Sequence, residues 1–403
     1  MNDLTLEDIR FRETTEKDAL TLVEFAREIF HSEWNIDFVR WKYFDNPAGR
    51  VYGRVAEAVI HDPDRSREAD DQDVKPIGFY GNIPVRLKLG KQVVTGAQAV
   101  DAMIAPEARR LGLFVRLNQQ TYAQMDQDGL MLDYALPNAA SEAGFVKRLG
   151  WQLVGHVPRF VKILDFQALP AEIRQSGIKS LAFKAMILGM GLMNSSKSST
   201  VRVSDSQTGE ENAGSMRLNI RPVEAFDERC DNLWQEASAV FSATDVISVH
   251  RDRVYLDWRY VKNPRPSHTG TNYQILIAER GERMVGLAVL SFRDEVTQRS
   301  AALTEWFVRP GDAEAGQALL VAAESSARQR ACAQVQCWML PQYTFYTSLL
   351  QRNRYLASAS PSAPNYLRYT TPFIIRRNPD VNVSCDPSRI KSWYLTMGDH
   401  DYF

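Results

Sequence analysis

The chain has 403 residues, of which 44% are hydrophobic and 24% are charged, and its formal net charge is -1. This length favours two domains over one, because a single hydrophobic core stops growing at about 250–300 residues. A net charge near zero gives no electrostatic basis for holding a long polyanion, so nucleic acid is not an expected partner.

In the first part of the chain, helical and strand-like patterns alternate. Residues Asp18 to Phe30 have the apolar spacing of an amphipathic helix. The hydrophilic stretch from Asp62 to Asp73 is expected to be a solvated loop between two strands. Further strands are expected over 51–60, 77–89, 93–104, 130–136 and 151–164, and further helices over 109–126 and 139–149. This alternation predicts an α/β fold with a mixed sheet and helices on both of its faces.

Two segments in the middle of the chain differ from what surrounds them. Ile178 to Met193 is apolar, but it is too short and too rich in lysine to span a bilayer. We expect it to be a connecting helix packed on a domain, with contact to a membrane surface as the alternative. Asn194 to Ser215 is rich in small and polar residues and cannot bury a core. The predicted organisation is a domain at 1–165, a linker at 166–216 and a second domain at 217–403.

The second domain repeats the first. The sequence Trp-Lys-Tyr-Phe-Asp-Asn-Pro at 41–47 recurs as Trp-Arg-Tyr-Val-Lys-Asn-Pro at 258–264. Other pairs are each 204 positions apart: Asp101 and Glu305, Pro106 and Pro310, Pro137 and Pro341, Trp151 and Tyr355. A constant offset over this length indicates a tandem duplication. We expect the repeated tryptophan motif to be a structural anchor, with stacking on a ligand as the alternative.

The cysteines and the N-terminus are typical of a protein in a reducing compartment. No Cys-x-x-Cys pair occurs, and no histidine stands at zinc-finger spacing from a cysteine. The first residues are acidic and lack the apolar segment of a signal peptide, which favours a cytoplasmic location. We expect no metal site and four reduced thiols, at Cys230, Cys332, Cys337 and Cys385.

The junction between the strand ending at Ile104 and the next helix carries an anion-binding pattern. Residues 106–114 read Pro-Glu-Ala-Arg-Arg-Leu-Gly-Leu-Phe. The N–H groups of a first helical turn are free, and the helix dipole favours negative charge there. Gly112 lets a phosphate approach the backbone, while Arg109 and Arg110 add charge-assisted hydrogen bonds. We therefore expect a pyrophosphate at this corner.

At this point the chain resembles the GNAT superfamily of N-acetyltransferases. The family signature is Arg or Gln, two residues, Gly, one residue, then Gly or Ala, and residues 109–112 fit its first four positions. Phe114 departs at the last position, where a small residue is usual. Asn138 resembles the asparagine that opens the family's next helix, and Leu-Gly-Trp at 149–151 resembles its common Leu-Gly-Phe. The resemblance covers residues 9–164 and, more weakly, 217–375.

The resemblance implies two tandem GNAT-like domains, each with a mixed, mostly antiparallel sheet flanked by helices. It also implies an acyl-CoA-dependent N-acetyltransferase, with acetyl-CoA lying between two splayed strands of the first domain. The main chain of Met103 and Ile104 would hold the pantetheine arm and polarise the thioester carbonyl. The pyrophosphate would lie on Arg109, Arg110, Leu111, Gly112, Leu113 and Phe114, with Asn138 opening the neighbouring helix.

The catalytic assignments follow from the need to deprotonate an amine and to protonate a leaving thiolate. Asp101 is the candidate base, or the group that orients the amine; alternatively, backbone groups or an arginine satisfy its carboxylate. Many family members carry a tyrosine as the acid, but Phe145 stands near that place here. Tyr134 and Ser141 are the candidate substitutes, with water as the alternative.

The second copy is expected to have lost the cofactor. The offset places Ala313 and Glu314 where Arg109 and Arg110 stand, while Gly316 matches Gly112 and would let the backbone turn as before. We therefore expect one CoA per chain. The C-terminal Trp-x-x-x-x-Gly-Asp is similar to endings in proteins of bacterial surface-polysaccharide pathways.

That similarity suggests an amino sugar or sugar nucleotide as the acceptor, with peptide and small-molecule amines as the other options. The alternative function is a non-catalytic acyl-CoA sensor or interaction module. The C-terminal tail is expected to pack on the second domain or to reach the substrate cleft. The oligomeric state does not follow from the sequence.

Overall fold

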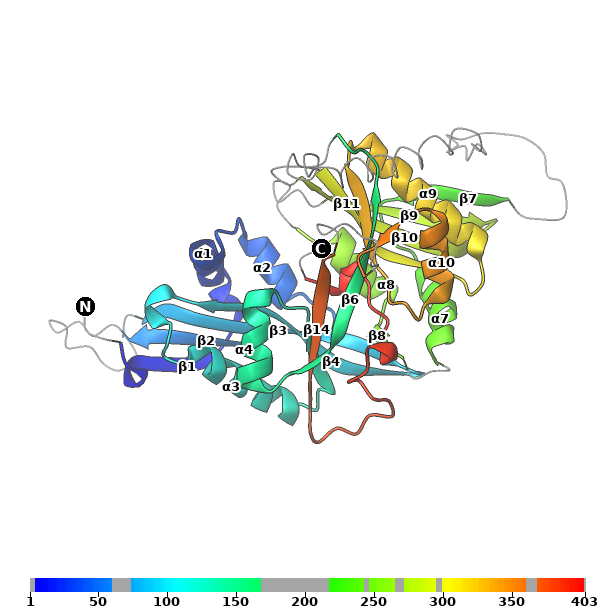
Figure 1. Cartoon of the computed structure of the whole chain (residues 1–403). Helices are drawn as coiled ribbons and strands as arrows, with labels where there is room; N and C mark the ends of the chain where they lie inside the picture. The colour runs from blue at the N-terminus through cyan, green and yellow to red at the C-terminus, as the bar shows by residue number, and fades with distance from the viewer. Residues whose placement is uncertain are drawn as a thin grey trace.

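The computed structural model describes residues 4–59, 74–167, 217–242, 246–264, 272–294, 299–359 and 368–401. The loop predicted at 62–73 and the segments at 178–193 and 194–215 lie outside these residues. Two α/β lobes stand side by side, joined by strands that pass between them (Figure 1). Within the described residues, no helix is long and apolar enough to cross a membrane.

The first lobe has a sheet with helices on both faces. Tyr43 of α2 packs against Phe79 of β3, while the next residue, Tyr80, packs against helices α3 and α4. Neighbouring strand residues point to opposite faces, so α2 covers one face and α3 and α4 cover the other. The strands are β1 (Ile9–Glu13), β2 (Tyr52–Val59), β3 (Val74–Leu89), β4 (Gln92–Ile104) and β5 (Leu132–Ala135); the helices are α1 (Ala19–Phe30), α2 (Ile36–Tyr43), α3 (Leu113–Gln127) and α4 (Ala139–Leu149).

The second lobe repeats this order. In both lobes four antiparallel strands are followed by a fifth that is parallel to the fourth. A short strand, β8 (Ile247–Val249), leaves the second lobe and pairs with β3 of the first. The main elements are β7 (Leu218–Val223), α7 (Arg229–Ser242), β9 (Asn272–Arg280), β10 (Arg283–Asp294), β11 (Arg299–Val308), α9 (Ala313–Gln329), β12 (Gln334–Trp338) and α10 (Thr344–Arg352), with α8 (Arg253–Leu256) after β8.

Two long strands cross between the lobes. β6 (Gln152–Ile163) pairs through its first half with β14 (Thr370–Arg377) and through its second half with β12. β14 in turn pairs with β5, so a strand from the end of the chain completes the sheet of the first lobe. β13 (Leu356–Ala357) also pairs with β6. The two sheets therefore form one continuous sheet, and neither lobe is closed without a strand from the other.

The fourth strand of each lobe carries a β-bulge at the equivalent place. On β4 the pairing with β3 passes from Asn82↔Ala99 to Tyr80↔Ala102, which inserts an extra residue next to Asp101. On β11 the pairing shifts in the same sense beside Glu305. A bulge re-aims the side chains around it, and both lobes use it to present a carboxylate.

The repeated tryptophan motif joins the lobes. The rings of Trp41 and Trp258 stack with their centroids 4.9 Å apart. Each indole N–H donates to the main-chain carbonyl of the other tryptophan, over 2.7 Å and 3.0 Å. This reciprocal contact is that of two equivalent elements meeting face to face. All four cysteines are free thiols, and Cys230, Cys332 and Cys337 are buried.

Candidate active site

The loop between β4 and α3 has the geometry of an anion site. Arg110 and Gly112 adopt left-handed φ angles of 78° and 74°. The helix expected from residue 109 therefore begins only at Leu113, after a 3-10 turn over Pro106–Ala108. Within the described residues, the N–H groups of Arg110, Gly112, Leu113 and Phe114 donate to no main-chain acceptor. Free N–H groups at a helix start are suited to a phosphate.

The two arginines of this loop leave their guanidinium groups available. Arg109 and Arg110 are both exposed, and neither guanidinium makes an ion pair or hydrogen bond with any described residue. Leu113 is buried in the core of the lobe and fixes the start of α3, while Leu111 is half-buried beside it. The loop thus presents two cations and several N–H donors from an anchored backbone.

Phe114 is accommodated by a small residue on the facing helix. The centroid of the Phe114 ring lies 5.3 Å from that of the Phe145 ring. A Cβ added at Gly144 would stand 3.1 Å from the Phe114 ring. Phe114 therefore fits at a position where the family usually has a small residue, because Gly144 on α4 has no side chain to clash with it. Phe145 is buried in this aromatic contact and has no proton to give.

Asn138 and Ser141 form the cap of α4. The Asn138 side chain accepts from the Ser141 N–H over 2.9 Å, and the Ser141 hydroxyl lies 3.0 Å from the same oxygen. This is an ordinary N-cap at an exposed helix start. The Ser141 hydroxyl is therefore used locally, within the cap of α4.

β4 and β5 splay apart beyond their second shared pair. Their pairing consists of Ala97↔Asp133 and Gln98↔Tyr134, so residues 99–104 of β4 have no partner on β5. The Ala105 N–H donates to Ile77 on β3. Because main-chain groups alternate sides along a strand, those of Met103 also face β3, whereas those of Ile104 face the gap. Of the two residues expected to contact the pantetheine arm, Ile104 is the better placed.

Asp101 lies in a charged cluster on the face that α2 covers. Its Oδ2 accepts from Lys42 Nζ over 2.6 Å and from the Tyr43 hydroxyl over 2.5 Å. From the sequence, backbone groups or an arginine are the structural partners expected for this carboxylate. The partners in the structure are a lysine and a tyrosine. Burial, with Asp101 and Asp401 nearby, raises the pKa of Tyr43 well above its usual range, so this phenol stays a neutral donor.

Lys42 links Asp101 to the C-terminal tail. Its side chain is 4% exposed, and its Nζ also lies 3.1 Å from Asp401 Oδ2. The ammonium stands 5.4 Å from the centroid of the Trp34 ring, within range of a cation–π contact. The tail therefore contacts both lobes instead of packing on the second alone.

Tyr134 faces the same region from β5. It lines a narrow cavity between the lobes together with Lys42, Gln98, Arg259 and Asp401. Burial, with Asp399 nearby, raises the pKa of the Tyr134 hydroxyl well above its usual range, so it remains protonated. The structure thus brings Asp101 and Tyr134 to one region around Lys42, and leaves Ser141 outside it.

Sequence reasoning missed Lys42, Gln98 and Asp401. The repeated motif could have indicated Lys42, because a cationic residue stands between tryptophan and tyrosine in both copies. Gln98 donates to the Asp399 carbonyl over 2.9 Å, a contact across 301 residues that no local pattern reveals.

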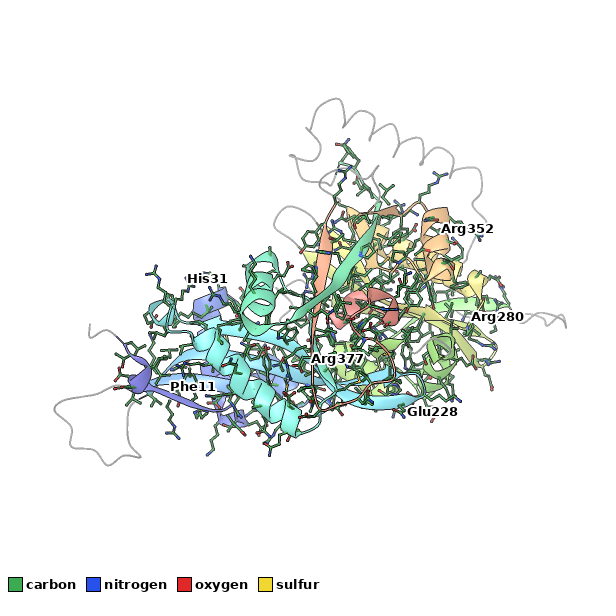
Figure 2. The ribbon with its side chains drawn as sticks, turned by 60° about the horizontal axis from the view of Figure 1, so that its bottom comes forward. Phe11, His31, Glu228, Arg280, Arg352 and Arg377 are labelled. Carbon is green, nitrogen blue, oxygen red and sulfur yellow. The ribbon has the colours of Figure 1, made fainter. Side chains whose placement is uncertain are left out.

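The corresponding junction in the second lobe has a different shape. Asp312 caps α9, which begins at Ala313, so Gly316 lies inside the helix. A Cβ at Gly316 would stand 2.8 Å from Leu349, which explains the glycine by helix packing. The expectation that Gly316 lets the backbone turn as Gly112 does is wrong. Arg280 pairs with Glu314 over 2.6 Å and with Asp312 over 3.2 Å at the outer edge of the lobe (Figure 2).

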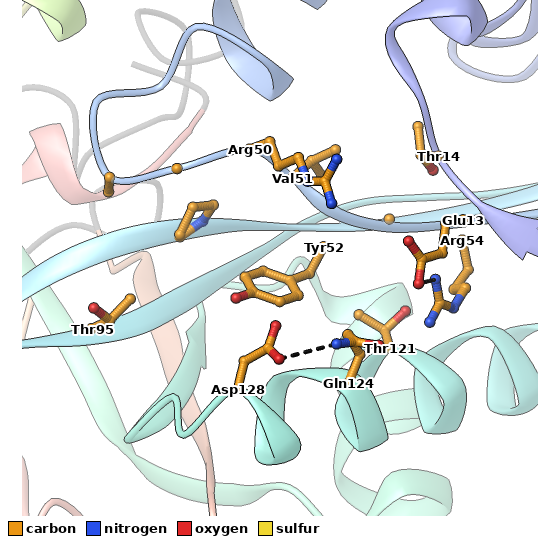
Figure 3. A pocket seen from close by; sticks show the side chains of 14 residues that line it. Glu13, Thr14, Arg50, Val51, Tyr52, Arg54, Thr95, Thr121, Gln124 and Asp128 are labelled. Atoms are coloured by element: carbon orange, nitrogen blue, oxygen red, sulfur yellow. Dashed lines mark hydrogen bonds and ion pairs between the residues drawn. The ribbon is translucent and has the colours of Figure 1, made fainter.

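A separate hollow of about 300 Å³ opens beside β2, near the C-terminal half of α3. Figure 3 shows Thr121, Gln124 and Asp128 rising from α3 toward Tyr52 on the strand above. Its charged groups are largely matched, since Arg54 pairs with Glu13 over 3.0 Å and Gln124 donates to Asp128. It contains none of the residues of the β4–α3 loop or of the Asp101 cluster.

Comparisons with known proteins agree with this arrangement. Residues 10–154 match the family model described as an acetyltransferase (GNAT) domain. No curated protein matches the sequence. A GCN5-related N-acetyltransferase from Anabaena variabilis superimposes with a TM-score of 0.56 at 13% identity, over 92% of this chain and 73% of that one.

Two further solved structures extend the likeness across both lobes. A probable N-acyltransferase from Enterococcus faecalis has a TM-score of 0.55 at 12% identity, over 92% of this chain and 72% of that one. Saccharomyces cerevisiae N-myristoyltransferase with bound myristoyl-CoA, a double-GNAT fold, has a TM-score of 0.56 at 10% identity, over 92% and 80%. The first lobe therefore carries a GNAT acetyltransferase domain over residues 10–154, and the tandem GNAT fold extends across both lobes.

Proposed function

We propose that this chain transfers an acetyl or short acyl group from acyl-CoA to a primary amine, at one site in its first lobe. The observation that carries the proposal is the open β4–α3 loop, where free N–H groups and two unpaired arginines stand at the mouth of the β4–β5 gap. Arg109 and Arg110 would hold the pyrophosphate, and acyl-CoA would supply the thioester. The main-chain N–H of Ile104 is suited to stabilise developing negative charge on the carbonyl oxygen.

The amine is expected to approach from the face opposite to α3. Asp101 lies on the α2 face, and its Oδ1 accepts no hydrogen bond from a described residue, because Lys42 and Tyr43 both use Oδ2. Oδ1 is therefore the atom that would orient the amine or take its proton. The Tyr134 hydroxyl is the candidate donor for the leaving thiolate, with water as the alternative.

The acceptor is proposed to be an amine that is cationic before it reacts. Asp101 and Asp401 both border the region around Lys42, and carboxylates favour an ammonium over a neutral group. An amino sugar or a sugar nucleotide meets this requirement, and so do peptide and small-molecule amines. The choice among them is left to a substrate panel.

The second candidate function is an acyl-CoA sensor without turnover. It is favoured by Phe145 at the place of the family's acid and by the two hydrogen bonds that already engage Asp101. A sensor would bind acyl-CoA through the same loop but release no thiol with any amine.

Calorimetric titration with acetyl-CoA and a thiol-release assay test both functions. We expect one acetyl-CoA bound per chain and thiol release that depends on the amine added. Two equivalent sites would refute the assignment to the first lobe. One site with no amine-dependent thiol release would favour the sensor.

A further inference from the structure

The two lobes carry equivalent carboxylate sites. In the first, the Tyr43 hydroxyl donates to Asp101; in the second, the Tyr260 hydroxyl donates to Glu305 over 2.9 Å. Both tyrosines come from the repeated motif, and both carboxylates sit beside the bulge of the fourth strand. What lies next to Glu305 can therefore be compared directly with what lies next to Asp101.

The place beside Glu305 is filled by the C-terminal tail. Gly398 approaches so closely that a Cβ would stand 2.2 Å from the Tyr260 hydroxyl oxygen and 2.4 Å from a Glu305 oxygen, so only glycine fits. Arg251, with no exposed side-chain surface, donates to Glu305 and to Asp399, each over 2.7 Å. The tail thus occupies the second lobe's site with buried charge pairing.

The same tail continues into the site of the first lobe. Gln98 donates to the Asp399 carbonyl, and Arg259 donates to the His400 carbonyl over 2.9 Å. Two residues beyond Asp399, the Asp401 carboxylate pairs with Lys42, which also pairs with Asp101. The second lobe therefore holds the segment that places a carboxylate on the Lys42–Asp101 pair.

We infer that Asp401 is a positioning residue for the proposed transfer, acting on Asp101 through Lys42. The inference rests on the proposed function. The groups around Asp101 are Lys42 and Tyr43 on α2, with Asp401 and His400 on the tail and Arg259 from the second lobe's motif. Because the Lys42 ammonium pairs with Asp401 as well as with Asp101, its attraction for Asp101 is weaker. The Asp101 carboxylate is then available to bind the amine. Without the Asp401 carboxylate, the positive charge of Lys42 acts on Asp101 alone.

Asp401→Asn tests this inference. We expect kcat to fall about tenfold, a part of the 10²–10⁴ that a positioned base contributes. Acetyl-CoA affinity should stay unchanged, because the β4–α3 loop is untouched. The acid limb of the rate profile should move to lower pH, since a stronger positive field favours the ionised carboxylate. A merely structural role would not move that limb.

Two further variants complete the experiment. Asp401→Glu should recover most of the rate, because it keeps the charge within reach of Lys42. Asp386→Asn is the matched control, because Asp386 is an exposed carboxylate of the same C-terminal region whose partners among the described residues are Ser388 and Arg389. An Asp401→Asn rate and pH profile equal to those of the control would overturn the inference and leave the proposed function standing. A wild-type chain that releases no thiol with any amine would instead refute the proposed function.

Discussion

The two lobes follow the same course to the end of their fourth strands and then differ in the next few residues. In the first lobe, two left-handed residues delay the helix until Leu113 and leave N–H donors and two arginines free. In the second, Asp312 caps a helix that starts four residues earlier in the 204-residue register. There Arg280 pairs with both Asp312 and Glu314. The start of the helix thus decides whether the junction leaves main-chain N–H groups and cationic side chains available.

The carboxylates of the two lobes show the same division. Asp101 is partly accessible and bonded through one oxygen, whereas Glu305 is fully buried among Arg251, Tyr260 and Thr396. Burial raises the pKa of Glu305, against the opposing effect of Arg251. A carboxylate in that position serves to anchor the tail. The carboxylate of the first lobe is thus left accessible, whereas that of the second is used to hold the C-terminal tail.

The largest expected effect comes from the arginines of the open junction. Arg109→Ala with Arg110→Ala should weaken acetyl-CoA binding by at least about 100-fold, because each charge-assisted bond contributes about 1.5–3 kcal/mol. Calorimetry measures the change. Glu314→Ala is the matched control at the closed junction and should leave the affinity as it was. An unchanged affinity in the double variant would contradict the assignment of the pyrophosphate to this loop.

Replacing the buried carboxylate of Glu305 should lower the stability of the fold and leave turnover nearly unchanged. Glu305→Gln removes one partner of a buried ion pair, which costs about 3–5 kcal/mol. Chemical denaturation should show this loss, while turnover at a temperature where the variant is folded should change little. A variant of normal stability but reduced turnover would place Glu305 in the chemistry instead.

Asp101 should show the opposite pattern. Asp101→Asn is expected to lower turnover by about 10²-fold, the lower end of what a positioned base contributes, with acetyl-CoA affinity nearly intact. High pH should relieve part of the loss, since more of the amine is then already deprotonated. If the variant lost stability but kept its rate per folded molecule, Asp101 would be a structural residue like Glu305.

The duplication was visible in the sequence because its offset is constant from the fourth strand to the last helix of each copy. The same offset gave a wrong prediction for Gly316, because it aligns Gly316 with Gly112 but does not show that α9 begins four residues earlier than α3 in this alignment. A second repeat went unnoticed: Arg12 and Asp18 recur as Arg221 and Asp227, at an offset of 209. Loop-length differences between the copies shift the register, so one offset cannot find both matches.

The exchange of strands between the lobes could not be read from the sequence. β6 is partly exposed and β14 is mostly buried, and neither sequence indicates which sheet the strand will join. The tail's contacts with Lys42 and Gln98 depend on that exchange, because β14 brings the end of the chain between the lobes. The β4–α3 loop, by contrast, depends on local residues: its glycine and arginines predict an anion site, which stays a prediction, while the helix begins at Leu113 instead of residue 109.

The smallest expected effect tests the repeat that was missed. Arg12 bonds Asp18 over 2.6 Å in the first lobe, where the Asp18 side chain is 9% exposed. In the second lobe Asp227 pairs with Arg229 over 2.7 Å and its side chain is 49% exposed. Burial raises the pKa of Asp18, but Arg12 and Thr15 outweigh it and hold the pKa below its usual value. A depressed pKa stabilises the fold above the unfolded value, near pH 4, and that stability is lost as the pH falls through the folded value.

Asp18→Asn should therefore lower the free energy of unfolding by about 1.5–3 kcal/mol at pH 7, and the difference from wild type should shrink below pH 4. Asp227→Asn should change stability by well under 1 kcal/mol, because an exposed ion pair is screened by solvent. Urea denaturation at pH 7 and at pH 3.5 measures both variants. Equal effects of the two substitutions would mean that burial does not distinguish the two copies at this position.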